Sequence, residues 1–521
     1  MSRRTRTGAG GSTTGRYVLA IDQGTTGSTA LLIDHEGEVR GRGYAELPQH
    51  FPRPGWVEHD GDEIWQSVLV AVRGALRSAR AGGRSIVSIG ITNQRETTLL
   101  WDRASGRPVG RAIVWQDRRT APRCEELRAR GLSGDVRKRT GLVLDPYFSA
   151  TKIEWMLSRD RVLERRARTG KIAFGTVDSW LIWKLTGGAL HATDPTNASR
   201  TLLFNLRARD WDPVQLRRFG VPRAVLPEVR RSSGSFGMTR GVRAIPDGVP
   251  IAGVAGDQQA ALYGQGCVRR GESKNTYGTG CFLLLNTGAK PVLSRAGLLT
   301  TIACGPRGGV AYALEGSVFI AGAALQWLRD GLDILKRAAD SEVMAKRVRD
   351  SGGVVLVPAF VGLGAPYWRA DVRGALLGLT RGTTRDHVAR AALESLAFQT
   401  RDLTEAMAED SGRAVRRLQV DGGAAANDWL MQYQSDLLGV PVARPRVIET
   451  TALGAGLLAG LGAGFWRTRS ELDRARRIGR VFRPRQGRAW REAEYGRWRA
   501  AVGMLLGGNA WTSPNPSRRS P

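Results

Sequence analysis

The sequence predicts an α/β protein built from two domains. A chain of 521 residues, 42% of them hydrophobic, is longer than one hydrophobic core usually supports. Its 66 glycines stand in short clusters between apolar runs and follow no fixed period, which argues against a fibrous protein. Strand-like and helix-like stretches alternate in both halves, so we expect an α/β domain in each half.

The first half begins with a predicted β-hairpin. Residues 17–22 are a compact apolar run, residues 23–28 are polar and contain glycine, and residues 30–33 are apolar again. Between Asp60 and Ala81 the apolar positions recur at helical spacing, which predicts a crossover helix capped by Asp60.

Further strands follow in the same half. Residues 86–92 are predicted to form a buried strand, and we expect residues 99–101 and 112–115 to continue the same sheet. Residues 249–255 form another apolar run, which leads into a helix of small residues at 260–264.

The second half begins near Gly266 and repeats this order. Residues 272–277 and 281–286 are predicted strands on either side of a Gly/Thr turn. Residues 417–420 are a further strand, and residues 427–438 are a predicted helix. The repetition suggests two related domains that close on one nucleotide.

Three polar turns follow predicted strands, at residues 22–26, 277–280 and 421–423, the last with Asn427 nearby. Backbone N–H groups and hydroxyls in such turns can hold phosphate oxygens, and the carboxylate of Asp22 can hold Mg²⁺ through water. An ordinary hairpin with a polar tip is the alternative for each turn taken alone.

Asp257 follows a predicted buried strand and precedes a predicted helix. In a cleft between domains its carboxylate could accept the proton of an attacking hydroxyl. The alternative role is that of a helix N-cap, and the two roles could coexist.

Arg95 and Glu96 place five hydrogen-bond donors beside an acceptor, a combination that can hold the hydroxyls of a small polyol. A surface ion pair is the alternative. Trp115, Tyr147 and Phe282 could form an apolar wall beside such a substrate, although core packing is the commoner role for aromatic residues at strand ends.

The charge of the chain is strongly positive, with 78 Lys and Arg residues against 48 Asp and Glu and a formal net charge of +30. Such a charge attracts nucleic-acid phosphates. The excess is almost all arginine, however, and it is spread along the chain without the interleaved aromatic residues of a single-strand binder. We therefore expect no specific nucleic-acid partner, and a bias toward arginine codons explains the excess equally well.

Other compositional features narrow the class of protein. No apolar run approaches the roughly 20 residues of a membrane helix, so no membrane insertion is expected. Residues 1–16 and 507–521 are predicted to be disordered tails, and the first of them has no apolar centre that would make it a secretory signal. Because the four cysteines and five histidines form no cluster, any metal should be Mg²⁺ carried by the substrate.

Six longer motifs carry a resemblance to a known family. The motifs are residues 22–26 (DQGTT), 54–60 (PGWVEHD), 90–98 (GITNQRETT), 112–116 (AIVWQ), 256–261 (GDQQAA) and 274–282 (KNTYGTGCF). They resemble the glycerol kinases of the FGGY carbohydrate kinase family, and the similarity runs from about residue 17 to beyond residue 466. Residues 147–155 and 374–394 resemble the general signatures of the family.

The resemblance implies a fold and a separate binding function for each domain. It implies two actin-like (ribonuclease H-like) domains with a catalytic cleft between them. Residues 17–265 would form the N-terminal domain, which binds glycerol and phosphate, and residues 266–506 the C-terminal domain, which binds the adenine nucleotide.

The resemblance also implies an activity. We expect a cytoplasmic enzyme that forms a homo-oligomer of two or four subunits. It would use ATP and Mg²⁺ to phosphorylate glycerol to sn-glycerol 3-phosphate by direct in-line transfer. This reaction is the first step of glycerol catabolism. Asp257 would be the catalytic base, and Asp22 and Asp257 would face Mg²⁺. Glycerol would be bound by Arg95, Glu96, Tyr147, Asp257, Gln258, Trp115 and Phe282. The nucleotide would be bound by Thr25, Thr26, Gly27, Thr279, Gly322, Gln326, Gly423 and Asn427.

Departures from the family pattern concern phosphate binding and regulation. Thr29 stands where the family commonly has an arginine, and Gly27 replaces a usual serine. Residues 237–247 lack the glycine-rich basic loop with which some members bind fructose 1,6-bisphosphate, so weak or absent inhibition by that sugar is expected.

Two rival functions stay open. One is another kinase of the same family, acting on a pentulose, gluconate or erythritol. The other is a non-catalytic regulator that binds nucleic acid through its basic surface.

Overall fold

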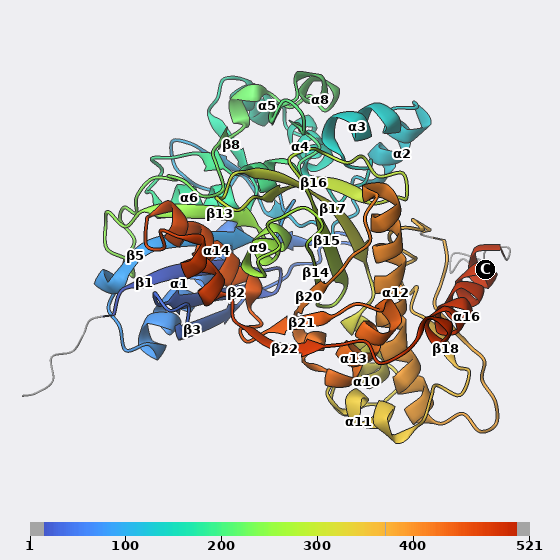
Figure 1. Cartoon of the computed structure of the whole chain (residues 1–521). Coiled ribbons are helices and arrows are strands. Elements are labelled where there is room, and N and C mark those ends of the chain that lie inside the picture. Colours follow the sequence, from blue (N-terminus) through green and yellow to red (C-terminus); the bar gives the residue numbers. More distant parts are fainter. Residues whose placement is uncertain (1–14, 370, 508–521) are drawn as a thin grey trace, which may run out of the picture.

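The computed structural model describes residues 15–369 and 371–507, and two mixed sheets form its framework (Figure 1). The two predicted tails lie almost wholly outside these residues. In the first sheet, β1 and β2 form the predicted hairpin, β3 extends it antiparallel, and β5 and β13 run parallel to β1. The strand order is β13 (Ile251–Gly256), β5 (Ile86–Asn93), β1 (Tyr17–Gln23), β2 (Gly27–Ile33) and β3 (Val39–Glu46).

The second sheet repeats this arrangement. An antiparallel set, β14–β15–β17–β16, is followed by β20 and β21, which continue parallel from β14, and β22 closes the edge. The order is β16 (Leu299–Cys304), β17 (Val310–Val318), β15 (Cys281–Gly288), β14 (Ser273–Tyr277), β20 (Leu418–Asp421), β21 (Val442–Pro445) and β22 (Ile478–Phe482). The repeat confirms the predicted α/β fold of two actin-like domains.

One prediction about the first sheet is wrong. The segments expected to continue it form strands in separate two-stranded sheets, β6 (Leu99–Asp102) with β8 (Ile172–Gly175), and β7 (Ala112–Ile113) with β4 (Glu58–His59). Their apolar pattern correctly indicates strands, but a local pattern does not specify which distant strand will be the partner.

Helices cover both faces of the first sheet. The predicted crossover helix is α1 (Gly61–Ser78), and Asp60 caps it by accepting a 2.8 Å hydrogen bond from the backbone N of Asp62. Leu19 and Ile21 of β1 pack in the cluster that includes α1, whereas Val18 and Ala20 pack with α14 (Thr450–Gly462). This alternation follows from the two-residue period of a strand.

Helix α14 comes from the second half of the sequence but lies against the first sheet and α9 (Asp257–Gly264) (Figure 1). Small residues allow this close approach. A Cβ atom at Gly454 would overlap the carbonyl oxygen of Ala260 in α9. Helix α14 therefore fixes the position of the helix that begins with Asp257.

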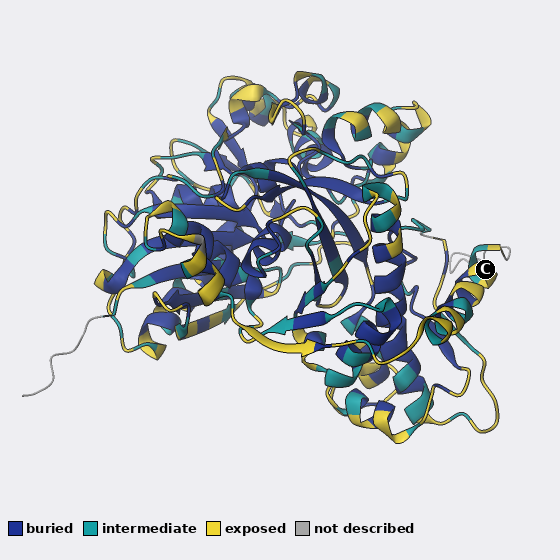
Figure 2. Cartoon of the chain, viewed as in Figure 1, coloured by how far each residue is buried: buried dark blue, intermediate teal, exposed yellow. Residues whose placement is uncertain are grey.

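The second sheet carries its own hydrophobic core. Its helices include α10 (Gly322–Asp330), α12 (Arg385–Ser411), α13 (Asp428–Leu438) and α16 (Arg488–Gly507), and Figure 2 shows the buried residues concentrated in the sheets and the inward faces of these helices. The other helices are α2 (Ala121–Ala129), α3 (Ser133–Thr140), α4 (Ser149–Ser158), α5 (Arg161–Arg168), α6 (Val177–Leu185), α7 (Pro195–Ala198), α8 (Pro213–Arg218), α11 (Asp340–Arg347) and α15 (Arg469–Ala475). Within the described part of the chain, no helix is both long and apolar enough to span a membrane.

Candidate active site

The ends of three parallel strands bring the central site residues together. Strands β1, β5 and β13 share one carboxyl edge, the edge at which α/β sheets usually bind ligands. Asp22 lies near the end of β1, Arg95 follows β5 by two residues, and Asp257 follows β13 directly. Residues far apart in the sequence therefore meet at one edge of the sheet.

Asp257 is the first residue of α9, and Gly256 is the N-cap. The alternative role of Asp257 as an N-cap is therefore wrong by one position. Its carboxylate is 30% exposed, and its Oδ1 lies 3.0 Å from Nε of Arg95 and accepts a 2.6 Å hydrogen bond from the backbone N of Gln258. The carboxylate is therefore held by one hydrogen bond and one ion-pair contact, and it is still accessible to a ligand.

Asp22 faces a second carboxylate instead of a cation. Burial raises the pKa of Asp22 to about 7, and the charge of Asp257 raises it further. Two carboxylates at one strand edge supply the oxygen ligands that Mg²⁺ prefers. Among the residues that the structure describes, no group of three or more His, Cys, Asp or Glu side chains is placed to hold a metal.

The structure shows the surroundings of the two positions, Thr29 and Gly27, that depart from the family pattern. Thr29 lies directly opposite Asp22 in the β1–β2 register, which is where an arginine would offset that carboxylate. Gly27 is buried, and a Cβ atom there would lie 2.6 Å from both the carbonyl oxygen of Ala45 and the hydroxyl of Tyr44. The local packing therefore requires glycine at position 27.

The first turn is held from the neighbouring strand. Gln94, just after β5, donates to Oε1 of Gln23 at 3.0 Å, and the indole N–H of Trp115 donates to Oγ1 of Thr25 at 2.8 Å. Thr25 is half-buried and Thr26 is exposed. The turn is thus the polar tip of the β1–β2 hairpin, which was the alternative to a phosphate-binding turn. Its hydroxyls and backbone lie at the same edge of the first sheet as Asp22.

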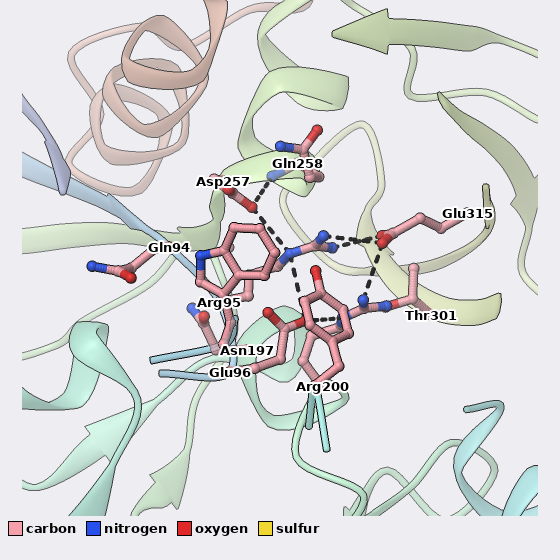
Figure 3. Close-up of polar contacts among 12 residues, drawn as sticks. Gln94, Arg95, Glu96, Asn197, Arg200, Asp257, Gln258, Thr301 and Glu315 are labelled. Carbon is pink, nitrogen blue, oxygen red and sulfur yellow. Dashed lines mark hydrogen bonds and ion pairs between the residues drawn. The ribbon is translucent and has the colours of Figure 1, made fainter. Parts of the chain in front are cut away.

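Arg95 and Glu96 are buried, with side-chain exposures of 2% and 1%, so the alternative of a surface ion pair is wrong. They are also not primarily paired with each other, because Nε of Arg95 lies 3.9 Å from Oε1 of Glu96. Each binds a partner distant in sequence: both terminal nitrogens of Arg95 donate to Glu315, and Nε of Arg200 donates to Glu96 at 2.6 Å (Figure 3). Glu96 has a positive φ of 62°, a backbone conformation that costs free energy for a non-glycine residue.

Two of the three predicted aromatic residues meet. The rings of Trp115 and Tyr147 pack edge to face with centroids 5.5 Å apart, and both are half-buried. Phe282 is half-buried in β15 and packs against a small apolar cluster that includes Leu262 of α9. No ring contact joins it to the other two within the described residues.

Gln258 is oriented by a buried lysine. Nζ of Lys274 donates to Oε1 of Gln258 and, at 2.7 Å, to Oγ1 of Thr276. Burial lowers the pKa of Lys274 to about 8, with nearby carboxylates, Asp421 first, opposing the shift. Lys274 thus links the first residues of α9 to the second sheet.

The second and third turns lie at one edge of the second sheet, because β14 and β20 pair in parallel with Thr276 opposite Asp421. The turn after β14 contacts the start of α10, where the backbone N of Ala323 donates to the carbonyl of Thr279 at 3.1 Å and Gly322 N donates to Gly278 O at 3.0 Å. Gln326 is exposed on the same helix.

The third turn contains Gly423 and leads to α13. Asn427 is the N-cap of this helix, because its Oδ1 accepts a 2.9 Å hydrogen bond from the backbone N of Leu430. The predicted nucleotide residues of the second half therefore lie on neighbouring turns and helix starts, although no contact joins Gln326 to Asn427 in the described residues.

Sequence reasoning missed three charged residues at this site: Lys274, Arg200 and Glu315. A glutamate in the middle of the apolar run 310–318 is a detectable signal, since an unpaired charge would not be buried there. Lys274 lies in β14, within the motif of residues 274–282, and a single lysine in a strand gives no local signal of a buried charge. Nothing local marks Arg200.

The chain is similar to known proteins over most of its length. Residues 17–264 match the N-terminal domain, and residues 273–463 the C-terminal domain, of the FGGY family of carbohydrate kinases. The glycerol kinase of Xanthomonas axonopodis pv. citri (strain 306) is 54% identical over 492 residues, which cover 94% of this chain and 99% of that protein. The glycerol kinase of Myxococcus xanthus (strain DK1622) is 55% identical over 489 residues, with 94% and 99% coverage.

A solved structure shows the same fold. The crystal structure of Plasmodium falciparum glycerol kinase with ADP matches with a TM-score of 0.88 and 35% sequence identity, covering 94% of this chain and 98% of that one. The similarity therefore extends over both domains.

Proposed function

Because the chain belongs to the FGGY family of carbohydrate kinases, we propose that it transfers the γ-phosphate of ATP to a terminal hydroxyl of glycerol, giving sn-glycerol 3-phosphate and ADP. The observation that carries the proposal is the accessible carboxylate of Asp257, oriented by Arg95 at the sheet edge where the first phosphate turn also ends. The high identity to two glycerol kinases supports glycerol as the acceptor.

The proposed reaction is a direct in-line displacement with Asp257 as general base. Asp257 accepts the proton of the attacking hydroxyl, whose oxygen forms a bond to the γ-phosphorus while the bond to the bridging oxygen of ADP breaks. Nε of Arg95, 3.0 Å from Oδ1 of Asp257, helps to hold the carboxylate in place. Mg²⁺ carried by ATP would neutralise phosphate charge, and Asp22 and Asp257 are the carboxylates that would face it.

The proposed polyol site lies on the first domain and its border with the second. Arg95, Glu96, Tyr147, Asp257 and Gln258 supply hydrogen-bonding groups for three hydroxyls, while Trp115 and Phe282 supply apolar surface for the carbon edge. The ring contact of Trp115 with Tyr147 and the buried Arg95–Glu96 segment support this assignment.

The proposed nucleotide site spans both domains. Thr25, Thr26 and Gly27 of the first hairpin would contact phosphates, since backbone N–H groups of such turns bind anions. Thr279, Gly322, Gln326, Gly423 and Asn427 of the second domain would surround the rest of the nucleotide, where the parallel pairing of β14 and β20 brings two turns to one edge.

A coupled assay with glycerol and ATP on the wild type and on Asp257→Asn tests this function. Loss of the base should lower kcat at least about a hundredfold, because general-base catalysis typically contributes 10²- to 10⁴-fold. Asp62→Asn is the matched control, since Asp62 also lies in the first turn of a helix but is exposed on α1, and it should keep wild-type turnover.

Wild-type protein without glycerol phosphorylation would contradict the function, and a fully active Asp257→Asn variant would contradict the assigned base. Erythritol, gluconate and a pentulose belong in the same assay, because preference for one of them would replace glycerol as the substrate. We also propose that the enzyme is cytoplasmic and that it is a homo-oligomer of two or four subunits. Light scattering of the purified chain would test the oligomeric state.

A further inference from the structure

A buried network of four charges joins the two domains beneath the proposed polyol site. Glu315 lies in the middle of β17, between β15 and β16 of the second sheet. Its Oε2 accepts a 2.6 Å hydrogen bond from Nη1 of Arg95, and its Oε1 accepts 3.0 Å bonds from Nη2 of Arg95 and Nη2 of Arg200. Arg200 reaches onward to Glu96, so Glu315 holds both arginines that surround the predicted polyol residues (Figure 3).

The network is unusual because all four side chains are at most 2% exposed. Two arginines balance two glutamates, but moving these charges out of water costs free energy that ion pairing recovers only with good geometry. Apolar side chains would fill the same space at lower cost. The retention of charge therefore favours a role in orienting the site over a role in stability.

The hydrogen bonds of Arg95 leave little freedom for its side chain. Nη1 donates to Glu315 and, at 3.3 Å, to Gln259, and Nη2 donates to the other oxygen of Glu315. Two of its five N–H groups remain, one on Nη2 and the one on Nε. The Nε atom lies at an ion-pair distance of 3.0 Å from Oδ1 of Asp257. The bidentate pair with Glu315 thus determines where the remaining donors of Arg95 point.

We propose that Glu315 is a positioning residue for the polyol site, which aims Arg95 at Asp257 and at a substrate hydroxyl and, through Arg200, holds Glu96. Glu315 itself touches no reacting atom. This inference rests on the proposed function, because it deepens the account of the same site.

Glu315 also lies close in the chain to the proposed nucleotide site. Strand β17 ends at Val318, and α10, with the proposed nucleotide-binding Gly322, begins four residues later.

The decisive variant is Glu315→Gln, which keeps the shape of the side chain and removes its charge. Arg95 and Arg200 then lack their shared anion, and we expect the KM for glycerol to rise about tenfold or more while the KM for ATP changes less than about twofold. Glycerol binding measured by calorimetry without nucleotide should weaken by the same factor. A purely structural defect would change both KM values or the amount of folded protein instead.

Glu394→Gln is the matched control, because Glu394 is also buried and ion-paired, with Arg390 at 2.9 Å, but lies in α12 away from the site. It should leave the glycerol KM unchanged. If Glu315→Gln does not fold, Arg200→Lys provides a second test: a single ammonium group cannot reproduce the two bonds that Nε and Nη2 make to Glu96 and Glu315, so the glycerol KM should rise without a change of net charge.

The outcomes separate this inference from the proposed function. A wild type that phosphorylates glycerol, with folded Glu315→Gln and Arg200→Lys variants of unchanged glycerol KM, overturns the inference and leaves the function intact. A wild type that neither binds nor phosphorylates glycerol overturns both. A selective rise in glycerol KM in either variant supports the positioning role.

Discussion

At the residue scale, the end of β1 places Asp22 near a second carboxylate, that of Asp257, which is itself ion-paired with Arg95. Asp22 lies opposite Thr29, and the groups that shift its pKa are the surrounding protein, by burial, and Asp257, both in the upward direction. Its carboxyl group is therefore half-protonated near neutral pH, where an ordinary aspartate would be ionised. If a Mg²⁺–nucleotide complex needs the ionised carboxylate, protonation of Asp22 competes with binding of that complex.

This predicts an acid limb in the pH profile of the proposed kinase. Because the pKa of Asp22 is raised to about 7, kcat/KM for ATP should fall as the pH decreases through about 7, where the carboxylate takes up a proton. Thr29→Arg places a cation opposite Asp22, favours the ionised form and should move the limb to lower pH by about one unit. Steady-state rates between pH 5.5 and about 8.5 measure the shift.

Thr29→Val is the matched control for this substitution. It keeps the branched shape of the side chain and adds no charge, so the limb should stay near pH 7. An identical profile in the wild type and Thr29→Arg would exclude Asp22 as the group that titrates.

The site shows which residues a sequence can reveal. Arg95, Glu96 and Asp257 were recognisable because polar residues directly follow apolar strands, and the structure brings these strand ends together. Their partners were not recognisable, because Arg95 and Glu315 are 220 positions apart and are neighbours only in the folded molecule.

At the element scale, each segment predicted as a strand or a helix contains one, but the local patterns did not predict every pairing. The hairpin of β1 and β2 and the capped helix α1 follow from turn residues and periodicity within a single short segment. The apolar patterns of β6 and β7 predict that both join the main sheet, yet β6 pairs with β8, about 70 positions later. The choice between such partners depends on the packing of the whole domain.

The packing of α14 makes a prediction about one glycine. Gly454→Ala would overlap the carbonyl oxygen of Ala260, so α14 and α9 must separate, and overpacking of this kind typically costs about 1–3 kcal/mol. Chemical denaturation should show the loss, and glycerol turnover should fall as well because α9 begins with Asp257.

Gly503→Ala is the control for helix propensity. Gly503 lies in α16 with open space around its Cβ position, so alanine should stabilise the protein by up to about 1 kcal/mol. Equal effects of the two substitutions would show that α14 and α9 are not tightly packed.

At the scale of the whole molecule, two domains of repeated topology share a site to which both contribute charged groups. Arg95 and Glu96 come from the first domain and Glu315 from the second, and α14 crosses from the second half of the sequence to the first sheet. The repeated order of strands and helices in the sequence indicated two related domains. The contacts between the domains depend on the tertiary structure, and no local sequence pattern predicts them.

The net charge of +30 leads to a prediction that distinguishes the two proposed substrates. A strongly positive field raises the local concentration of an anion such as ATP and leaves neutral glycerol unaffected. Raising the ionic strength from 0.01 to 0.15 M shortens the Debye length from roughly 30 to about 8 Å, so kcat/KM for ATP should fall severalfold. At saturating ATP, kcat/KM for glycerol should stay nearly constant over the same range, which makes glycerol the internal control. An equal decline for both substrates would mean that salt acts on the protein as a whole and that its charge does not guide the nucleotide to the site.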